Sequence, residues 1–181
     1  MSENWIWIDL EMTGLNPEIH TIIEIASIVT DHQLNIIAQG PAIAIRPSEE
    51  DLNSIDEWSL NQHRKSGLLK RAQDSPYNCQ QAETETLNFL KKYSLKNKSP
   101  LCGNTIWQDR RFLIKYMARL ESFFHYRNID VSSVKELAKK WYPYLPVLQK
   151  QGSHLALDDI KESIRELKYY RDNIFVYKDI M

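Results

Sequence analysis

The chain has 181 residues, of which 43% are hydrophobic and 10% aromatic, and its formal net charge is −1. This length suffices for one well-buried core and is too short for two comfortable domains, so we expect a single domain over residues 1–181. The near-neutral charge lacks the basic excess of proteins that hold long nucleic acids through many phosphates, so a nucleic-acid ligand should be short or held at one end.

No apolar stretch approaches the ~20 residues of a membrane span, and no basic segment precedes the first apolar run. We therefore expect a cytoplasmic protein without membrane contact. Cys79 and Cys102 are far apart in sequence and have no CxxC partner. They predict reduced structural cysteines rather than a disulfide or a zinc site.

The first predicted strand, residues 5–11, is apolar and becomes acidic where it ends. Side chains alternate along a strand, so Asp9 and Glu11 share the face of the two tryptophans, while aliphatic side chains fill the other face. Large apolar groups on both faces predict a central strand covered on both sides. Two carboxylates at its exit repel each other and are costly to bury unless a cation lies between them, and a divalent metal is the expected cation.

The spacing of these two acids is weak evidence by itself. The same spacing occurs in two other acidic pairs, Glu49 with Asp51 and Glu83 with Glu85. Both of those pairs have polar neighbours and are predicted to be solvated. Asp9 and Glu11 differ because a turn-forming run follows them at residues 12–17, and open α/β sheets bind ligands at the carboxyl ends of strands.

Residues 21–29 are rich in β-branched side chains and predict a second strand. Residues 34–45 predict a third strand, in which Pro41 indicates an edge or irregular position. Because short polar turns join these three strands, we expect them to be antiparallel.

Residues 48–75 are polar with helical tendency, and residues 78–93 predict a scaffold helix. In the first segment, Trp58 and His63 are expected in a small satellite core when the residues alone are considered. Residues 100–105 predict a short strand, followed by a helix with an apolar stripe that continues to Leu120. Asp109 lies in the first turn of that helix, on its buried face. An acid there can simply interact with the helix dipole, but its inward direction makes that explanation insufficient.

Residues 126–133 predict a last short strand whose serines open the next helix. The final helix carries an apolar stripe from Leu157 to Tyr170. Asp159 flanks this stripe, whereas Asp158 points nearly opposite, so Asp159 is the better candidate for a buried site. His154 precedes the helix and could reach the same place. This order of strands and helices predicts an α/β domain with a mixed sheet.

Four inward-facing acids and one histidine therefore stand out, Asp9, Glu11, Asp109, Asp159 and His154. Their order and spacing resemble the DEDD exonucleases of the ribonuclease H-like fold, and a histidine five residues before the last acid matches the branch called DEDDh. Within that branch, four longer stretches resemble the oligoribonucleases, namely residues 7–15, 103–113, 124–132 and 156–160. The resemblance covers nearly the whole chain and implies a mixed five-stranded sheet with three antiparallel N-terminal strands and helices on both faces.

The resemblance implies a 3′-to-5′ exoribonuclease that hydrolyses short RNA of two to five nucleotides, especially dinucleotides, to 5′-mononucleotides. Carboxylate oxygens suit Mg²⁺ or Mn²⁺. Two such ions, held by all four acids, would clamp the attacking and leaving oxygens. His154 titrates near neutrality and is the expected general base.

The resemblance also implies a substrate pocket. Leu15 and Trp58 match residues that sandwich a base. Tyr126 matches an active-site tyrosine that reaches in from the second subunit of a homodimer; no obligatory partner of another kind is evident. Four residues match groups that cap the terminal phosphate, His63, Thr105, Arg127 and Ser132. At two further positions, Trp107 and Leu155, the chain departs from the family pattern, which bears on substrate preference.

Two alternatives remain open. One is a related DEDDh exonuclease that acts on longer DNA or on tRNA 3′ ends. The other is a non-catalytic nucleic-acid-binding adaptor on the same fold, which predicts lost acids, although all four acids and His154 are present.

Overall fold

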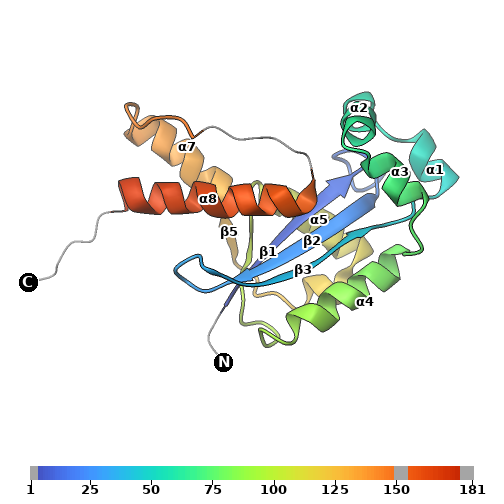
Figure 1. Cartoon of the computed structure of the whole chain (residues 1–181), viewed down its shortest axis with the longest axis horizontal. Coiled ribbons are helices and arrows are strands. Elements are labelled where there is room, and N and C mark those ends of the chain that lie inside the picture. The colour runs from blue at the N-terminus through green and yellow to red at the C-terminus, as the bar shows by residue number, and fades with distance from the viewer. Residues whose placement is uncertain (1–3, 149–154, 176–181) are drawn as a thin grey trace, which may run out of the picture.

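The computed structural model describes residues 4–148 and 155–175, which fold around a five-stranded sheet (Figure 1). The strands are β1 (Trp5–Met12), β2 (Ile22–Thr30), β3 (Ile36–Ala44), β4 (Leu101–Gly103) and β5 (Asn128–Asp130). The helices are α1 (Glu49–Asn53), α2 (Glu57–Lys65), α3 (Leu68–Gln73), α4 (Cys79–Leu90), α5 (Ile106–Tyr116), α6 (Ala118–Glu121), α7 (Val131–Trp141) and α8 (Ala156–Ile174).

The sheet is mixed, and its strands lie in the order β3-β2-β1-β4-β5. β1, β2 and β3 pair antiparallel, whereas β1 with β4 and β4 with β5 pair parallel. The predicted antiparallel opening is therefore confirmed. β3, which contains Pro41, lies at an edge, and its register against β2 shifts between Ala26 and Ile28, so both the edge and the irregularity that Pro41 indicated are present.

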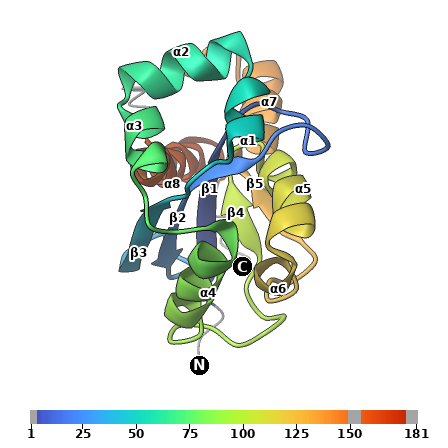
Figure 2. The same ribbon diagram turned by 90° about the vertical axis from the view of Figure 1, so that its right-hand side faces the viewer.

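Helices cover both faces of the sheet (Figures 1 and 2). On one face, Ile6 and Ile8 of β1 join a buried cluster with side chains of α4, α5 and α6. On the other face, Trp7 packs with α7 and α8. In Figure 1, α1, α2 and α3 group near the end of β1. Among the described residues, no helix combines the length and apolarity that a membrane crossing requires.

The predicted continuous helix from about Trp107 to Leu120 is wrong. Met117 leaves the helical conformation at φ −137°, which separates α5 from α6. The backbone N–H groups of Arg119 and Leu120 then donate to the Glu83 carboxylate of α4, at 2.8 and 3.0 Å. This carboxylate satisfies the first turn of α6, so the chain restarts its helix there.

The prediction that Glu83 is solvated is also wrong. Glu83 is only 4% exposed, and Arg119 Nε pairs with its second carboxylate oxygen at 2.7 Å. The expectation that serines open α7 is also wrong, since the Asp130 side chain caps that helix by accepting from Ser132 N at 2.9 Å. An acceptor placed before the helix satisfies one of its first N–H groups.

The satellite-core prediction holds for only one of its two residues. His63 is 2% exposed, whereas Trp58 is 64% exposed. In α2 the buried positions are Ser59 and His63, four residues apart and therefore on one face. Trp58 precedes Ser59 by one residue and points about 100° away from that face.

Candidate active site

Three carboxylates meet where β1 leaves the sheet. Asp9 and Glu11 share the face of β1 that α8 covers, because they alternate in step with Trp7. Trp7 belongs to the same buried cluster as Ile160 of α8. Asp159 stands in the first turn of α8, and one oxygen from each of Asp9, Glu11 and Asp159 lies within 4.8 Å of the others. Side chains distant in sequence thus converge as predicted.

The turn after β1 is held firmly. The register of β1 against β2 shifts between Glu11 and Met12. Such an irregularity bends a strand and re-aims its side chains. The Thr13 hydroxyl accepts from Thr21 N at 3.0 Å, and its carbonyl accepts from Asp56 N at 3.0 Å. The start of α2 is therefore tied to the rim on which the acids lie.

Asp109 approaches the acids from the other helical layer. It lies in the first turn of α5, is 7% exposed, and accepts a hydrogen bond from Leu10 N at 3.0 Å through Oδ1. That bond fastens α5 to β1 between Asp9 and Glu11. Asp109 is also a source of negative charge acting on Asp9. The fourth predicted acid is therefore beside the other three.

Burial and nearby negative charges raise the pKa values of three of these acids. Burial, then the negative charges of Asp109 and Glu11, raises the pKa of Asp9 well above its ordinary range. Burial, followed by the charges of Asp159, Glu24 and Asp109, raises the pKa of Glu11 from 4.5 to about 8. Burial also raises the pKa of Asp109 to about 7, although the bond from Leu10 N opposes the shift. Close carboxylates with raised pKa values are typical of functional sites.

The residues fit divalent cations. The three grouped ligands are all hard carboxylate oxygens, and among the described residues no cysteine or histidine belongs to the group. Oxygen ligands favour Mg²⁺ or Mn²⁺ over zinc. A bound cation would also offset the carboxylate charges that, after burial, raise the pKa values of Asp9 and Glu11. The physical state of the acids therefore agrees with the predicted metal site.

Two histidines were predicted to serve the site. His63 is buried beside it, with Nε2 2.8 Å from Met12 O and Nδ1 3.8 Å from Glu11 Oε2. His63 thus contacts the backbone and an acid at the end of β1. His154, the expected general base, lies outside the described residues.

Two predicted phosphate-binding hydroxyls lie together at the ends of the parallel strands. Thr105 Oγ1 is 3.0 Å from Ser132 Oγ, which donates to Asn104 Oδ1 at 3.1 Å. Thr105 N donates to Asp130 Oδ1 at 2.9 Å. Thr105 adopts a positive φ of 54° at the start of α5. This bond to Asp130 ties the unusual backbone to the end of β5.

The predicted base-stacking residues are both exposed. Leu15 is 68% exposed and Trp58 64% exposed. Each lies two residues from the hydrogen bond between Thr13 O and Asp56 N, Leu15 after Thr13 and Trp58 after Asp56. Both therefore belong to the rim next to Glu11, where a ligand could reach them.

Tyr126 and Arg127 lie at the opposite end of the sheet from the acid cluster. They precede β5, which runs parallel to β4 and β1, so they lie at the end of the sheet where β1 starts. Arg127 lines the same hollow as Trp5, the first residue of β1. Tyr126 is 73% exposed, and the Arg127 guanidinium lies 5.4 Å from its ring centre. One chain does not bring this pair to Thr105 and Ser132.

Two site residues escaped prediction from the sequence. Glu24 of β2 pairs across the hairpin with Glu11 and acts electrostatically on Asp9. The hairpin register would have revealed it, because paired residues in an antiparallel ladder share a face. Asn104 was part of a recognised stretch, but nothing in its spacing predicted that its amide would hold Ser132.

Comparison with known proteins identifies the family. The family model described as exonuclease matches residues 6–167. Oligoribonuclease of Aliivibrio fischeri is 60% identical over 174 residues, which cover 96% of each chain. The chain belongs to the oligoribonuclease family of exonucleases. Another oligoribonuclease, of Marinobacter nauticus, is 59% identical over 171 residues, 94% of this chain and 95% of that protein.

Solved structures agree with the fold of this oligoribonuclease family member. Exonuclease I of E. coli, in the zinc-bound form of its complex with single-stranded DNA, matches with a TM-score of 0.74 at 15% identity. The match covers 96% of this chain and 41% of that one, so the chain spans less than half the length of exonuclease I. The predicted ribonuclease H-like α/β fold is confirmed.

Membership also confirms the predicted enzyme class, a 3′-to-5′ exoribonuclease. The exonuclease family depends on divalent metal ions, and the acidic cluster of this chain agrees with that dependence.

Proposed function

We propose that this oligoribonuclease family member, as a single exonuclease domain over residues 1–181, removes 5′-mononucleotides from the 3′ end of RNA two to five nucleotides long. Dinucleotides are the preferred substrate. The observation that carries the proposal is the grouping of the Asp9, Glu11 and Asp159 oxygens within 4.8 Å, beside the buried Asp109. The cytoplasmic location expected from the sequence fits this function.

In this proposal the four acids hold two Mg²⁺ or Mn²⁺ ions. When bound, the cations stabilise the charge that develops on the attacking and leaving oxygens of the phosphodiester. Asp9 and Glu11 are presented together by β1, Asp109 by α5 and Asp159 by α8. His154 removes the proton from the attacking water, because an imidazole exchanges protons readily near neutral pH.

Short substrates are favoured because the far end of the ligand is capped. Thr105 and Ser132 offer neighbouring hydroxyls to a terminal phosphate, and His63 lies close behind Glu11. A cap of this kind leaves no path for a longer chain. Leu15 and Trp58 stack on a base, which holds RNA without reading its sequence.

Arg127 and Tyr126 complete the pocket from a second subunit in this proposal. The exposure of Tyr126 and its place before β5 support an action in trans. Mixing Asp9→Ala with Tyr126→Ala tests this idea. Subunit exchange is expected to restore part of the turnover, because one of the two sites then has an intact acid cluster and an intact tyrosine. Failure of exchanged mixtures to regain turnover would show that Tyr126 acts within its own subunit or not at all.

The main experiment compares a labelled RNA dinucleotide with a heptamer, with and without chelator. The proposal expects cation-dependent hydrolysis that is faster for the dinucleotide and abolished by Asp9→Ala. Equal or faster action on the heptamer, or on a long DNA or tRNA end, favours the related DEDDh exonuclease. Unchanged turnover in Asp9→Ala would exclude this acid cluster, and absence of any turnover would favour the adaptor.

A further inference from the structure

Glu24 is a buried carboxylate beside the acid cluster that the proposed reaction does not use. It lies in β2, pairs across the hairpin with Glu11, and is 2% exposed. Its Oε1 accepts from Arg71 Nη1 at 2.7 Å, and its Oε2 accepts from Ala156 N at 3.2 Å. One side chain thus joins β2, α3 and the first residue of α8.

Glu24 supplies an acceptor at the start of α8. The residue before the helix, Leu155, makes no side-chain capping bond. Four other helices are capped by the residue that precedes each of them, Ser48, Asp56, Asn78 and Asp130. The first N–H groups of a helix need acceptors. Glu24 supplies one to α8 from the neighbouring strand, at a position three residues before Asp159.

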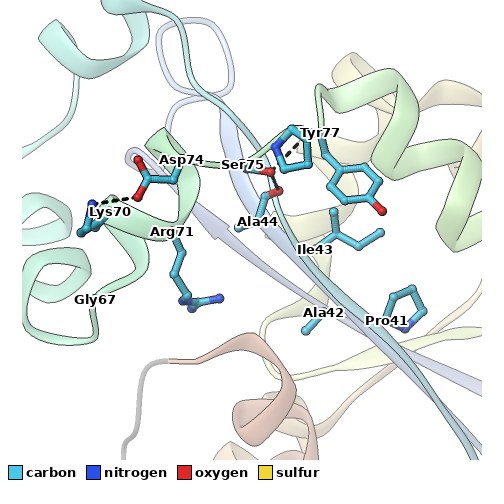
Figure 3. Close-up of a pocket in the computed structure, with 11 residues that line it drawn as sticks. Pro41, Ala42, Ile43, Ala44, Gly67, Lys70, Arg71, Asp74, Ser75 and Tyr77 are labelled. Carbon is cyan, nitrogen blue, oxygen red and sulfur yellow. Dashed lines mark hydrogen bonds and ion pairs between the residues drawn. The ribbon is translucent and has the colours of Figure 1, made fainter.

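Arg71 is committed to the same carboxylate. It lines a hollow of about 630 Å³ between α3 and β3 (Figure 3). Figure 3 shows its side chain extending away from Asp74, which pairs instead with Lys70 at 2.8 Å. Arg71 therefore neutralises Glu24. A carboxylate with both oxygens engaged in this way serves to fix its neighbours rather than to bind a cation.

Both charges are felt in the acid cluster. The negative charge of Glu24 raises the pKa of Glu11, and the positive charge of Arg71 lowers it. Replacing Glu24 alone would therefore change both the charge near Glu11 and the contact at the start of α8.

We propose that Glu24 is a positioning residue: it fixes the first turn of α8 against β2, and through that turn sets Asp159 beside Asp9 and Glu11. This inference rests on the proposed function, since it takes Asp159 to be a cation ligand. Arg71 holds the Glu24 carboxylate in its buried place through the 2.7 Å ion pair.

Two double variants separate geometry from charge. Glu24→Gln with Arg71→Met and Glu24→Met with Arg71→Met both remove the two charges, and glutamine and methionine have similar length. Only glutamine keeps an oxygen that can accept from Ala156 N. We expect the methionine variant to bind Mn²⁺ about 10- to 100-fold more weakly than the glutamine variant, the range seen when groups that orient metal ligands are removed. Its kcat on the RNA dinucleotide should fall, while KM stays within about twofold.

Mn²⁺ binding is measured by calorimetry or electron paramagnetic resonance on the full chain, so the readout does not depend on turnover. Equal Mn²⁺ affinity of the two double variants would overturn the inference. Glu24→Asp is measured alongside, because it keeps the charge but is too short to reach both donors. Wild-type Mn²⁺ affinity in this variant would also overturn the inference, even if the methionine variant did not fold.

Two controls complete the design. Glu83→Met with Arg119→Met removes a similar buried ion pair and helix cap at α6. This control variant should have a lower Tm but unchanged Mn²⁺ affinity. If it loses as much Mn²⁺ affinity as the Glu24→Met with Arg71→Met variant, the effect at Glu24 is explained by general destabilisation. Asp159→Asn tests the proposed function separately. If Asp159→Asn binds Mn²⁺ like the wild type, the proposed function fails. If Asp159→Asn loses Mn²⁺ binding but the two Glu24/Arg71 double variants bind Mn²⁺ equally well, only this inference fails.

Discussion

Two regions of the molecule bury carboxylates in opposite ways. Between α4 and α6, Glu83 is surrounded by donors, with Arg119 Nε at 2.7 Å and the N–H groups of Arg119 and Leu120 at 2.8 and 3.0 Å. At the end of β1, Asp9 and Glu11 face other carboxylates, and burial together with those charges raises the pKa of both. The first arrangement is compensated within the chain, whereas the second has a deficit of positive charge.

The difference shows where stability has been given up for function. A buried acid with its hydrogen bonds complete stabilises the fold. A group of buried acids without a cation destabilises it, and the chain keeps such a group only where a ligand supplies the missing charge. Burial alone therefore does not identify a site, because Glu83 is only 4% exposed, whereas Asp9, Glu11 and Asp159 are partly buried.

The largest effect is expected from Asp9→Asn, which removes a charge from the deficient region. Turnover of the RNA dinucleotide should fall by on the order of 10³-fold or more, because the cations lose a ligand. The metal-free protein should at the same time gain thermal stability, since the raised pKa of Asp9 opposes folding at neutral pH, where the unfolded carboxyl is ionised. Turnover assays and melting curves in chelator check both effects. A lower metal-free Tm in Asp9→Asn would contradict the electrostatic account of this region.

The pH dependence of stability should differ in sign with and without metal. In metal-free protein, folded Glu11 holds its proton up to about pH 8, while the unfolded group releases it near 4.5. The contribution of Glu11 to the free energy of unfolding is therefore fully present below pH 4.5 and is lost as the pH rises through about 8. The loss amounts to on the order of a few kcal/mol. Excess Mn²⁺ should reverse the trend, because cations bind the deprotonated acids. The measurement is Tm from pH 5 to 8, in chelator and in excess Mn²⁺. The same dependence of Tm on pH in both conditions would refute the predicted change of sign.

A smaller and opposite effect is expected in the compensated region. Glu83→Leu leaves the N–H groups of Arg119 and Leu120 without their acceptor, which should lower the free energy of unfolding by about 2 kcal/mol. Turnover per folded molecule should stay unchanged. Urea unfolding and dinucleotide hydrolysis under native conditions provide the two measurements. Loss of turnover without loss of stability would mean that Glu83 belongs to the site after all.

Local patterns in the sequence predicted much of the fold and part of the site. Alternation in β1 placed Asp9 and Glu11 on one face, and helical spacing turned Asp109 inward, as observed. Pro41 marked an edge strand. These inferences succeed because each depends on the geometry of a single element.

Pairings between distant elements could not be predicted in the same way. Glu83 was expected to be solvated because its neighbours are polar, but Arg119 reaches it from 36 positions away. Glu24 likewise depends on Arg71 and on Ala156, 47 and 132 positions away. Such donors reach an acid only when whole helices pack together. The residue pattern within one helix therefore cannot predict these pairs.

The smallest effect is expected at Asp158, which tests the comparison within one turn of α8. Its side chain is 47% exposed and pairs with Lys161 at 3.3 Å. An exposed pair three residues apart and a helix-dipole contact together contribute no more than about 1 kcal/mol. Asp158→Ala should therefore bind Mn²⁺ and hydrolyse the dinucleotide like the wild type, whereas Asp159→Ala should lose both. Equal losses in the two variants would mean that the whole turn, rather than the inward carboxylate of Asp159, sustains the site, and the contrast between compensated and deficient acids would no longer explain it.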